Sequence, residues 1–472
     1  MTSSPPPAPT VAIAGGGLAG LAAGCALASA GFRVTLFERR PYLGGRASSY
    51  QHPGTGEIVD NCQHVLLGCC TNLIDLYRRS GVEQKIRWYD RLTFLEPGGR
   101  ASVIRPSALP APLHAMPSFL GADCLSLADK FAIGRAMAVL APAEPSDRGE
   151  TFLAWLQRHG QTHRAIERFW KTILVSALNE DLDQISVPYA AQVIRESFLK
   201  SAAAGRMGVP TVPLTELYNA AGNAIRERNG DVLFRSGIES FRAQPSDVSV
   251  VVNGQEQRFD YLVLAVSFDV LAKLLPDSPA SAPLAEQLSQ FTTSPITGIH
   301  LWFDREISDL DHAVLLDRTI QWMFHKSRII ERRETQAREN GQGSYVEVVV
   351  SNSRSLVEKS RGEIVELATR ELAEFFPAAR EATLTKSTVI KEVNATYSPR
   401  PGVDRYRPRP ESPWPRVFLA GDFVSSGWPA TMEGAVRSGY RAAESLARVS
   451  GARQASFQVP NLAGTGFMRS VR

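Results

Sequence analysis

The sequence predicts an α/β fold, because strand-like and helix-like segments alternate near both ends of the chain. Residues 11–38 contain a short apolar strand, a glycine-rich turn, a helix of small residues and a second strand that ends on an acid. Residues 417–422 form another apolar strand, and residues 432–439 open a helix. Strands that alternate with helices are typical of a parallel sheet. At 472 residues, the chain is long enough for roughly two or three lobes.

The glycine-rich turn has the spacing G-x-G-x-x-G, with Gly15, Gly17 and Gly20 at its three positions. Gly15 permits the tight turn, Gly17 lets the backbone approach a pyrophosphate, and Gly20 lets the helix pack close to the strand. The free N–H groups at the start of the helix favour phosphate binding. Glu38 ends the second strand, where a carboxylate accepts hydrogen bonds from ribose hydroxyls and repels a 2′-phosphate. The unit therefore predicts a Rossmann-like domain for FAD or NAD rather than NADP.

A second glycine motif, Gly-Gly-Arg at residues 44–46, follows Glu38 closely. The two glycines let the chain run against a bulky cofactor, and Arg46 can donate charge-assisted hydrogen bonds to its phosphates. Near the other end, a strand ends in Gly421-Asp422 and a helix opens at Met432. The combination resembles the FAD-binding family that includes amine oxidases, protoporphyrinogen oxidases and carotenoid desaturases.

This resemblance implies an FAD with Asp422 on its ribityl chain, Ile238 at its adenine and the backbone near Met432 at the pyrimidine edge of the flavin. No cysteine lies beyond Cys124, so thioether attachment through the C-terminal part is excluded and the FAD is expected to be non-covalent. The full set of expected FAD-binding residues is Gly15, Gly17, Leu18, Ala19, Gly20, Glu38, Arg39, Gly44, Gly45, Arg46, Ile238, Gly421, Asp422, Thr431, Met432, Glu433 and Ala435.

A narrower resemblance rests on residues 60–72, DNCQHVLLGCCTN, and residues 426–435, SGWPATMEGA. Both stretches are similar to those of the squalene-associated FAD enzymes, the hydroxysqualene dehydroxylases, and the likeness covers residues 10–448. It implies that the protein reductively removes the hydroxyl of hydroxysqualene to give squalene, as part of hopanoid and isoprenoid synthesis. The expected substrate is therefore a hydrophobic triterpenoid.

Other branches of the family remain alternatives. A carotenoid-type desaturase shares the cofactor site and the apolar substrate but runs in the oxidative direction. An amine oxidase is disfavoured, because Thr431 stands where that branch has a tyrosine and residues 292–303 contain no lysine. Protoporphyrinogen oxidation lacks a matching substrate motif. A non-catalytic flavoprotein that presents a lipid to a partner would share the same fold.

By the resemblance, residues 60–64 lie near the isoalloxazine, which makes Asp60, Asn61, Gln63 and His64 the catalytic candidates. Removal of an allylic hydroxyl needs a proton donor, a shielded allylic cation and hydride from the reduced flavin N5. His64 or a protonated Asp60 can donate the proton. Both side chains can equally serve only as hydrogen-bond partners of backbone or cofactor.

Two tryptophans are candidates for an apolar substrate pocket. Trp170 and Trp428 offer ring faces that tolerate a cation, although ordinary core packing explains them as well. Residues 105–121 carry large apolar side chains among four prolines. This segment is expected to be either a membrane-dipping channel mouth or a packed connector.

Composition excludes several classes of protein. The 52 basic and 48 acidic residues nearly balance, so the sequence lacks the excess of positive charge that is typical of nucleic-acid-binding proteins. The five cysteines lack metal-binding spacing and suit a reduced compartment, so no metal is expected. No apolar run reaches the length of about 18–20 residues that a membrane span needs. We therefore expect a cytoplasmic protein, soluble or peripheral at the inner face of the membrane. One dinucleotide motif is present, and it does not identify the electron donor.

The positions of these motifs predict how the chain is divided. The FAD-binding domain is expected in three pieces, residues 10–100, 205–284 and 391–448. Residues 101–204 are expected to form a mainly helical substrate or cap region. Strands and helices of an inserted α+β substrate-binding domain are expected over residues 285–390. Residues 1–9 and 449–472 are expected to be flexible tails.

Overall fold

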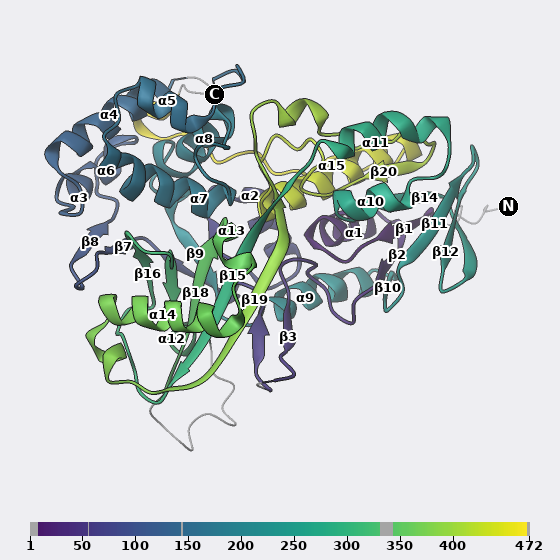
Figure 1. The fold of residues 1–472 in the computed structure, drawn as a ribbon. Helices are drawn as coiled ribbons and strands as arrows, with labels where there is room; N and C mark the ends of the chain where they lie inside the picture. Colours follow the sequence, from purple (N-terminus) through teal and green to yellow (C-terminus); the bar gives the residue numbers. More distant parts are fainter. Residues whose placement is uncertain (1–7, 55, 143–144, 331–342, 470–472) are drawn as a thin grey trace.

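The computed structural model describes residues 8–54, 56–142, 145–330 and 343–469. Its first sheet is parallel and has the strand order β10-β2-β1-β14-β20. These strands are β1 (Thr10–Ala14), β2 (Arg33–Glu38), β10 (Asp231–Phe234), β14 (Tyr261–Leu264) and β20 (Val417–Leu419). Segments far apart in the sequence thus meet in one sheet, at the right of Figure 1.

Successive residues of these strands face opposite sides of the sheet, as the period of two requires. Val11 and Ile13 pack in a core with α1 (Leu18–Ser29), α9 (Leu214–Arg226) and α15 (Met432–Ser450). Ala12 and Ala14 face the other core, which also holds residues of α10, α11 and the small antiparallel sheet of β11, β12 and β13. The bounds of these elements are α10 (Phe268–Leu274), α11 (Ala282–Ser289), β11 (Ile238–Ala243), β12 (Val248–Val252) and β13 (Gln255–Phe259). Both faces of the parallel sheet are therefore covered.

The second large sheet has seven strands in the order β19-β15-β18-β17-β16-β7-β8. These are β7 (Leu92–Leu95), β8 (Ala101–Ile104), β15 (Thr293–Phe303), β16 (His312–Leu315), β17 (Trp322–Phe324), β18 (Ser344–Ser351) and β19 (Leu384–Tyr397). Helix α14 (Arg361–Phe375) buries Ile364 and Leu372 against Ile299 and Val348 on one face of this sheet. Helices α12 (Lys326–Ile329) and α13 (Arg354–Val357) are short.

Helices α3–α8 form a separate lobe, at the upper left of Figure 1. They are α3 (Met116–Leu120), α4 (Leu127–Leu140), α5 (Phe152–Arg158), α6 (His163–Ala165), α7 (Thr172–Leu178) and α8 (Val187–Ile194). Helix α2 (Thr71–Arg79) packs beside α15. The remaining strands are the β3 (Ser49–Gln51) and β4 (Ile58–Asp60) hairpin and a sheet of β5 (Leu66–Leu67), β9 (Met207–Pro210) and β6 (Ile86–Tyr89). Among the described helices, none is both long enough and apolar enough to cross a membrane.

The predicted α/β fold with a Rossmann-like sheet is confirmed, and two details of the predicted division differ. Strand β7, expected within the FAD-binding domain, pairs with β16 of the seven-stranded sheet. The segment after α15 is not a loose tail over its described residues. Phe457 and Met468 are buried, and the Asn461 side chain accepts a hydrogen bond from Arg437 over 2.6 Å. The expected leader at residues 1–7 lies outside the described residues.

Candidate active site

The glycine turn has the geometry that a phosphate site needs. Gly15 adopts φ +103°, and a Cβ there would lie 2.6 Å from the Ala265 carbonyl oxygen, so only glycine fits. Gly17 caps helix α1 with φ −75°, and the nearest atom to a Cβ at Gly17 would be the Gly45 Cα at 3.9 Å. Apart from the residues next to it in the chain, no side chain therefore lies within 4 Å of this Cβ position at the start of α1, which fits a pyrophosphate.

The part of the predicted cofactor site that is expected to bind adenosine lies beside Glu38. The Glu38 carboxylate accepts hydrogen bonds from the backbone N–H groups of Gly16 and Arg40, each over 2.7 Å. A carboxylate can accept about four hydrogen bonds, so the Glu38 carboxylate can still accept hydrogen bonds from ribose hydroxyls. The Ser236 N–H donates to the Glu38 carbonyl, and Gly237 lies against Arg39. The structure thus brings Arg39 close to the start of β11, where Ile238 lies.

Past the pyrophosphate site, the Gly-Gly-Arg motif meets the C-terminal Gly-Asp motif. Arg46 Nη2 lies 2.7 Å from Asp422 Oδ1, and Arg46 Nη1 donates to the Ala395 carbonyl over 2.8 Å. The Asn61 amide donates to the Arg46 carbonyl, and the Asn61 N–H donates to the Ser48 carbonyl over 2.9 Å. Because Arg46 binds Asp422 here, its contact with a phosphate stays a prediction.

Through these contacts, residues 44–46, Asp422 and Asn61 lie next to one another. That the flavin half of a bound FAD lies there, beside the catalytic candidates at residues 60–64, stays a prediction.

Asp60 is an ion-pair partner and not a proton donor. Its Oδ1 accepts hydrogen bonds from Ser49 Oγ at 2.6 Å and from the Leu214 N–H at 3.1 Å. Its Oδ2 accepts from Lys326 Nζ at 2.8 Å. Burial would raise the pKa of Asp60, but the Lys326 ammonium and these donors outweigh it and hold the pKa below its usual value. The expected general-acid role of Asp60 therefore has no support, because the carboxyl is ionised.

Lys326 joins Asp60 to two further side chains of the same buried cluster. Its ammonium also donates to Gln63 Oε1 over 2.7 Å and lies 3.5 Å from Glu347 Oε2. Burial would lower the pKa of Lys326, yet the two carboxylates raise it, so the ammonium stays charged. Burial raises the pKa of Glu347 to about 7, although Lys326 opposes the shift. The cluster thus holds one permanent ion pair and one carboxyl that titrates near neutrality.

Sequence reasoning did not identify Lys326 or Glu347. Glu347 lies within the run Val346 to Val350 of strand β18, where a single acid among valines was a signal of a buried functional group. His300, similarly placed in the apolar strand β15, is also buried, and its Nδ1 lies 2.8 Å from the Tyr345 hydroxyl. Residues 292–303 contain no lysine, but α12 contributes Lys326 to this cluster.

His64 has a defined tautomer. Its Nδ1 lies 2.8 Å from the Cys62 carbonyl oxygen; since a carbonyl only accepts, Nδ1 carries the proton and Nε2 keeps a lone pair. Burial lowers the pKa of His64, which leaves the ring neutral at neutral pH. Gln63 Nε2 donates to the His64 carbonyl over 3.0 Å. The His64 ring therefore keeps a free lone pair on Nε2, and its segment is held by Lys326 through Gln63.

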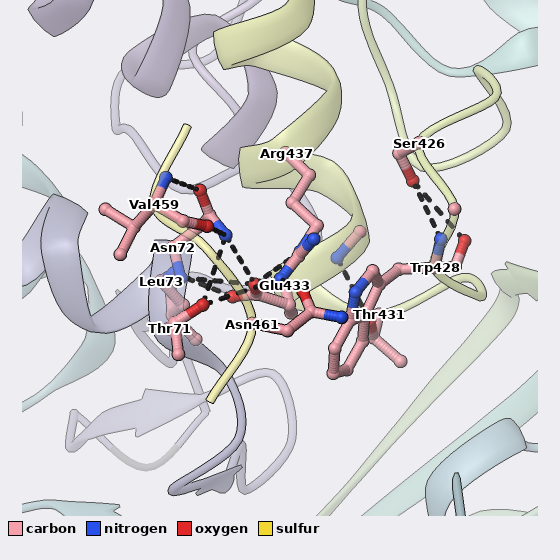
Figure 2. A network of polar contacts seen from close by, with 12 residues as sticks. Thr71, Asn72, Leu73, Ser426, Trp428, Thr431, Glu433, Arg437, Val459 and Asn461 are labelled. Atoms are coloured by element: carbon pink, nitrogen blue, oxygen red, sulfur yellow. Dashed lines mark hydrogen bonds and ion pairs between the residues drawn. The ribbon is translucent and has the colours of Figure 1, made fainter. Parts of the chain in front are cut away.

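Glu433, expected among the FAD-binding residues, uses its side chain for contacts within the protein, and its contact with FAD stays a prediction. The carboxylate is fully buried and accepts hydrogen bonds from the N–H groups of Asn72 and Leu73 at the start of α2. The Asn72 side-chain amide and Arg437 Nε also donate to it, the latter over 2.6 Å (Figure 2). Four donors occupy the carboxylate, so it caps α2 and anchors that helix to α15.

The residues just before Glu433 form the start of α15. Thr431 caps the helix, and its Oγ1 accepts from the Gly434 N–H over 3.1 Å (Figure 2). Met432 Sδ accepts from the Tyr218 hydroxyl over 3.6 Å. The Ala435 N–H donates to the Thr431 carbonyl over 2.9 Å. Backbone contacts from this turn to a flavin stay a prediction.

The two tryptophans are packed side chains. Trp170 is fully buried in the helical lobe, where its Nε1 donates to Gln161 Oε1 over 2.8 Å. Trp428 is also buried, and the Arg437 guanidinium lies 4.7 Å from its ring centroid. Core packing thus accounts for Trp170, and the ring of Trp428 already holds a cation. Within the described residues, no group of three or more His, Cys, Asp and Glu is arranged to hold a metal.

The doubly covered parallel sheet, the open turn before α1 and the buried acid at the end of β2 define a dinucleotide-binding protein with a Rossmann-like fold. The chain belongs to the flavin containing amine oxidoreductase family, whose model matches residues 18–447. Its cofactor is FAD, and the residues of the turn fit that group because a side chain at position 17 would fill the space that the pyrophosphate needs.

The sequence is similar to those of carotenoid desaturases. A 15-cis-phytoene desaturase of Synechococcus elongatus is 29% identical over 464 residues, which cover 92% of this chain and 95% of the relative. The 15-cis-phytoene desaturase of Arabidopsis thaliana is 26% identical over 466 residues, 94% of this chain and 81% of the relative. A probable zeta-carotene desaturase of Synechococcus elongatus is 24% identical over 473 residues, 92% and 98% of the two chains.

Solved structures share the fold over nearly the whole chain. A putrescine oxidase superposes with a TM-score of 0.69 at 16% identity and covers 93% of this chain and 99% of its own. The cyclohexylamine oxidase of Brevibacterium oxydans gives 0.65 at 17% identity, with 94% and 100% covered. At this level of identity the likeness concerns the fold alone.

Proposed function

We propose that this protein is a carotenoid-type desaturase that removes two hydrogens from a long acyclic isoprenoid. The observation that carries the proposal is the His64 ring, whose Nδ1–H is bound to the Cys62 carbonyl and whose pKa burial lowers. Such a ring accepts a proton at neutral pH and does not donate one. The proposal is supported by the similarity of most of the chain to phytoene and zeta-carotene desaturases.

Desaturation removes one hydride and one proton from adjacent carbons. Bound FAD supplies the chemistry for the hydride, because its N5 accepts two electrons and one hydrogen. The chain must supply the proton acceptor, and Nε2 of His64 has the free lone pair that this step needs.

The Asp60–Lys326 pair has a positioning role in this proposal. Lys326 binds Asp60 and Gln63 at once, and Gln63 in turn binds the His64 carbonyl. These three contacts fix residues 60–64 from within the protein. The His64 ring then stays in one orientation while a flexible substrate is bound.

Reductive dehydroxylation of hydroxysqualene is the second candidate, because residues 60–72 and 426–435 are similar to those of hydroxysqualene dehydroxylases. That reaction needs a proton donor for the leaving hydroxyl. Asp60 is ionised and His64 is neutral, so neither fits the requirement. Glu347, with a pKa of about 7, carries a proton near neutral pH, but it contacts Lys326 and not residue 64. The side chains therefore favour the oxidative reaction.

A single-turnover experiment distinguishes the two reactions. The oxidised holoenzyme is mixed with 15-cis-phytoene without oxygen, and in parallel the photoreduced holoenzyme is mixed with hydroxysqualene. We expect bleaching of the flavin absorbance by phytoene, in proportion to new double bonds found by chromatography. Reoxidation of the flavin by hydroxysqualene, matched by squalene and with no bleaching by phytoene, would replace the first proposal with the second.

Both candidate substrates dissolve in membranes and not in water. A cytoplasmic protein that meets the inner face of the membrane is the arrangement that suits such a substrate, and we include this location in the proposal. A single turnover does not require an electron acceptor that reoxidises the flavin.

A further inference from the structure

Strand β19 lies at one edge of the seven-stranded sheet. Among the described residues, the backbone of residues 387–391 forms hydrogen bonds only with β15, so the N–H and C=O groups on the other side of the strand have no partner there. Further along β19 the edge is covered, because Arg46 Nη1 donates to the Ala395 carbonyl over 2.8 Å. Residues 387–391 are therefore an open template for a further strand.

A groove runs along this edge between two walls. One wall is α14, and the other is the β3–β4 hairpin, whose His52 Nε2 lies 2.9 Å from Thr388 Oγ1. Figure 1 shows α14 and β3 beside β19. The groove has two parts, of about 650 and 310 Å³, which share several lining residues. We define the β19 groove by residues 387–391 together with His52, Arg361, Val365 and Arg370.

The side chains along the β19 groove carry an excess of positive charge. Arg361 and Arg370 are exposed, and in the described part of the chain neither has a carboxylate within ion-pair distance. The Lys391 ammonium donates to two backbone carbonyls at the end of α13, which leave its charge uncompensated. Glu366 is the one acid among the described residues that line the groove. The groove therefore favours a ligand with negative charge.

The surface between these charges is apolar and includes Val365, Leu384 and Val389. An open strand edge beside a helix has the geometry to which an extended peptide adds as a further strand. Main-chain hydrogen bonds then provide the affinity, and the flanking side chains select the sequence. A small anion would contact the arginines but would leave the open edge unused. The edge, the apolar floor and the positive walls together fit an extended acidic segment of a protein.

We propose that the β19 groove binds an extended, acidic segment of a partner protein, which adds to β19 as a further strand of the sheet. A strand advances about 3.4 Å per residue, so about five residues of the segment pair with residues 387–391. Its carboxylates lie at Arg361 and Arg370. A second copy of the chain fits less well, because a symmetric contact between two β19 edges would bring these like charges together. None of the residues expected to bind FAD lines the groove, so this binding is independent of the proposed reaction.

Three fluorescent peptides test the groove in the full-length holoprotein. The acidic peptide Glu-Val-Glu-Val-Thr-Val-Glu alternates polar and apolar side chains as a strand does. The second peptide, Glu-Val-Glu-Pro-Thr-Pro-Glu, keeps the charge, but its prolines cannot donate hydrogen bonds to a strand. The third peptide has lysine in place of each glutamate. By fluorescence anisotropy, we expect the acidic peptide to bind at least about tenfold more tightly than either of the others.

Hydrogen exchange locates the bound peptide on the protein. With the acidic peptide, backbone amides within residues 387–391 should exchange more slowly, because their outward N–H groups gain acceptors. Strand β13, at the edge of the small antiparallel sheet, is the internal control and should exchange at an unchanged rate.

A pair of double variants isolates the positive wall. Arg361→Glu with Arg370→Glu is expected to weaken binding of the acidic peptide about tenfold or more and to strengthen binding of the lysine peptide. The matched control, Arg242→Glu with Arg258→Glu, changes two exposed arginines on β11 and β13 and should bind all three peptides as the wild type does.

Three results would overturn the proposal. One is wild-type holoprotein that binds the proline peptide as tightly as the acidic peptide, or binds neither. Another is an Arg361→Glu, Arg370→Glu variant that retains its FAD absorbance and binds the acidic peptide as tightly as the control variant. The third is a wild-type dimer whose residues 387–391 exchange slowly without any peptide, which would assign the edge to a second copy.

Discussion

Lys326 Nζ lies 2.8 Å from Asp60 Oδ2, and the two side chains are only 2% and 4% exposed. The pair joins the short helix α12 to the end of β4, so it crosses from the seven-stranded sheet to the β3–β4 hairpin. A buried pair of this kind matters for stability mainly because removal of one partner would leave the other charge buried and unpaired, which lowers the free energy of unfolding. It also fixes the segment that presents His64.

Replacing Lys326 by methionine should leave the Asp60 charge buried without its counter-ion. We expect the free energy of unfolding in urea to fall by about 3–5 kcal/mol. The matched control is Lys200→Met, since Lys200 forms a buried pair with Glu196 at 2.6 Å in the helical lobe. Both variants should lose stability, but only Lys326→Met should change the flavin absorbance spectrum. Equal spectra in the two variants would contradict a positioning role for Lys326.

Glu347→Gln should stabilise the protein at alkaline pH. The pKa of Glu347 rises from 4.5 to about 7 on folding, so the folded state keeps a proton that the unfolded state releases between these values. The stabilisation of the folded state by protonated Glu347 is therefore fully present below pH 4.5 and is lost as the pH rises to about 7. At about pH 8 the variant should exceed the wild type by up to about 3 kcal/mol in urea unfolding, and at about pH 4 the difference should vanish. A difference that does not vary with pH would refute the assignment.

His64→Gln should slow desaturation roughly a hundredfold or more, since the variant loses the proton acceptor. In the wild type, the rate should fall as the pH drops through the lowered pKa of His64, and the variant should lack this acid limb. His159→Gln is the control, because His159 Nδ1 makes the same 2.8 Å contact with a backbone carbonyl in the helical lobe. Anaerobic flavin bleaching against pH measures both. An acid limb that survives in His64→Gln would assign the proton to another group.

Gly17→Ala should lower the affinity for FAD without changing the stability of the folded apoprotein. Its φ of −75° and the 3.9 Å to the nearest atom let the folded chain accept a methyl group, but that methyl would occupy the phosphate space. We expect an unchanged unfolding temperature of the apoprotein and an FAD affinity lower by about tenfold or more. Gly134→Ala on α4, where no atom lies within 4 Å of the added carbon, should bind FAD normally. Fluorescence titration of the apoproteins decides the outcome.

The features that the sequence predicted well are local ones. Gly15, Gly17 and Gly20 are close together in the chain, and their spacing alone defines the turn, the helix and the flanking strands. Arg46 and Asp422 were each expected to bind the same cofactor, but their contact with one another was not predicted. Their direct contact depends on the order of the strands in the parallel sheet, which no local pattern contains.

The features that the sequence did not predict depend on distant pairings. Lys326 follows an aromatic strand and has no signature that points to Asp60, because the contact is created by the packing of two sheets. Glu433 belongs to a recognised motif, yet its carboxylate serves α2, whose start at Thr71 lies hundreds of positions away. The burial of Phe457 likewise depends on the tertiary packing of residues that lack regular structure.

The parallel sheet takes β1 and β2 from the first forty residues and β20 from residues 417–419. During synthesis, the glycine turn therefore leaves the ribosome long before the strand and helix that complete the cofactor site. The intervening lobes must fold while one edge of this sheet is unpaired. Exposed strand edges of this kind invite wrong pairing, so the newly made chain is vulnerable to aggregation until β20 and α15 have emerged.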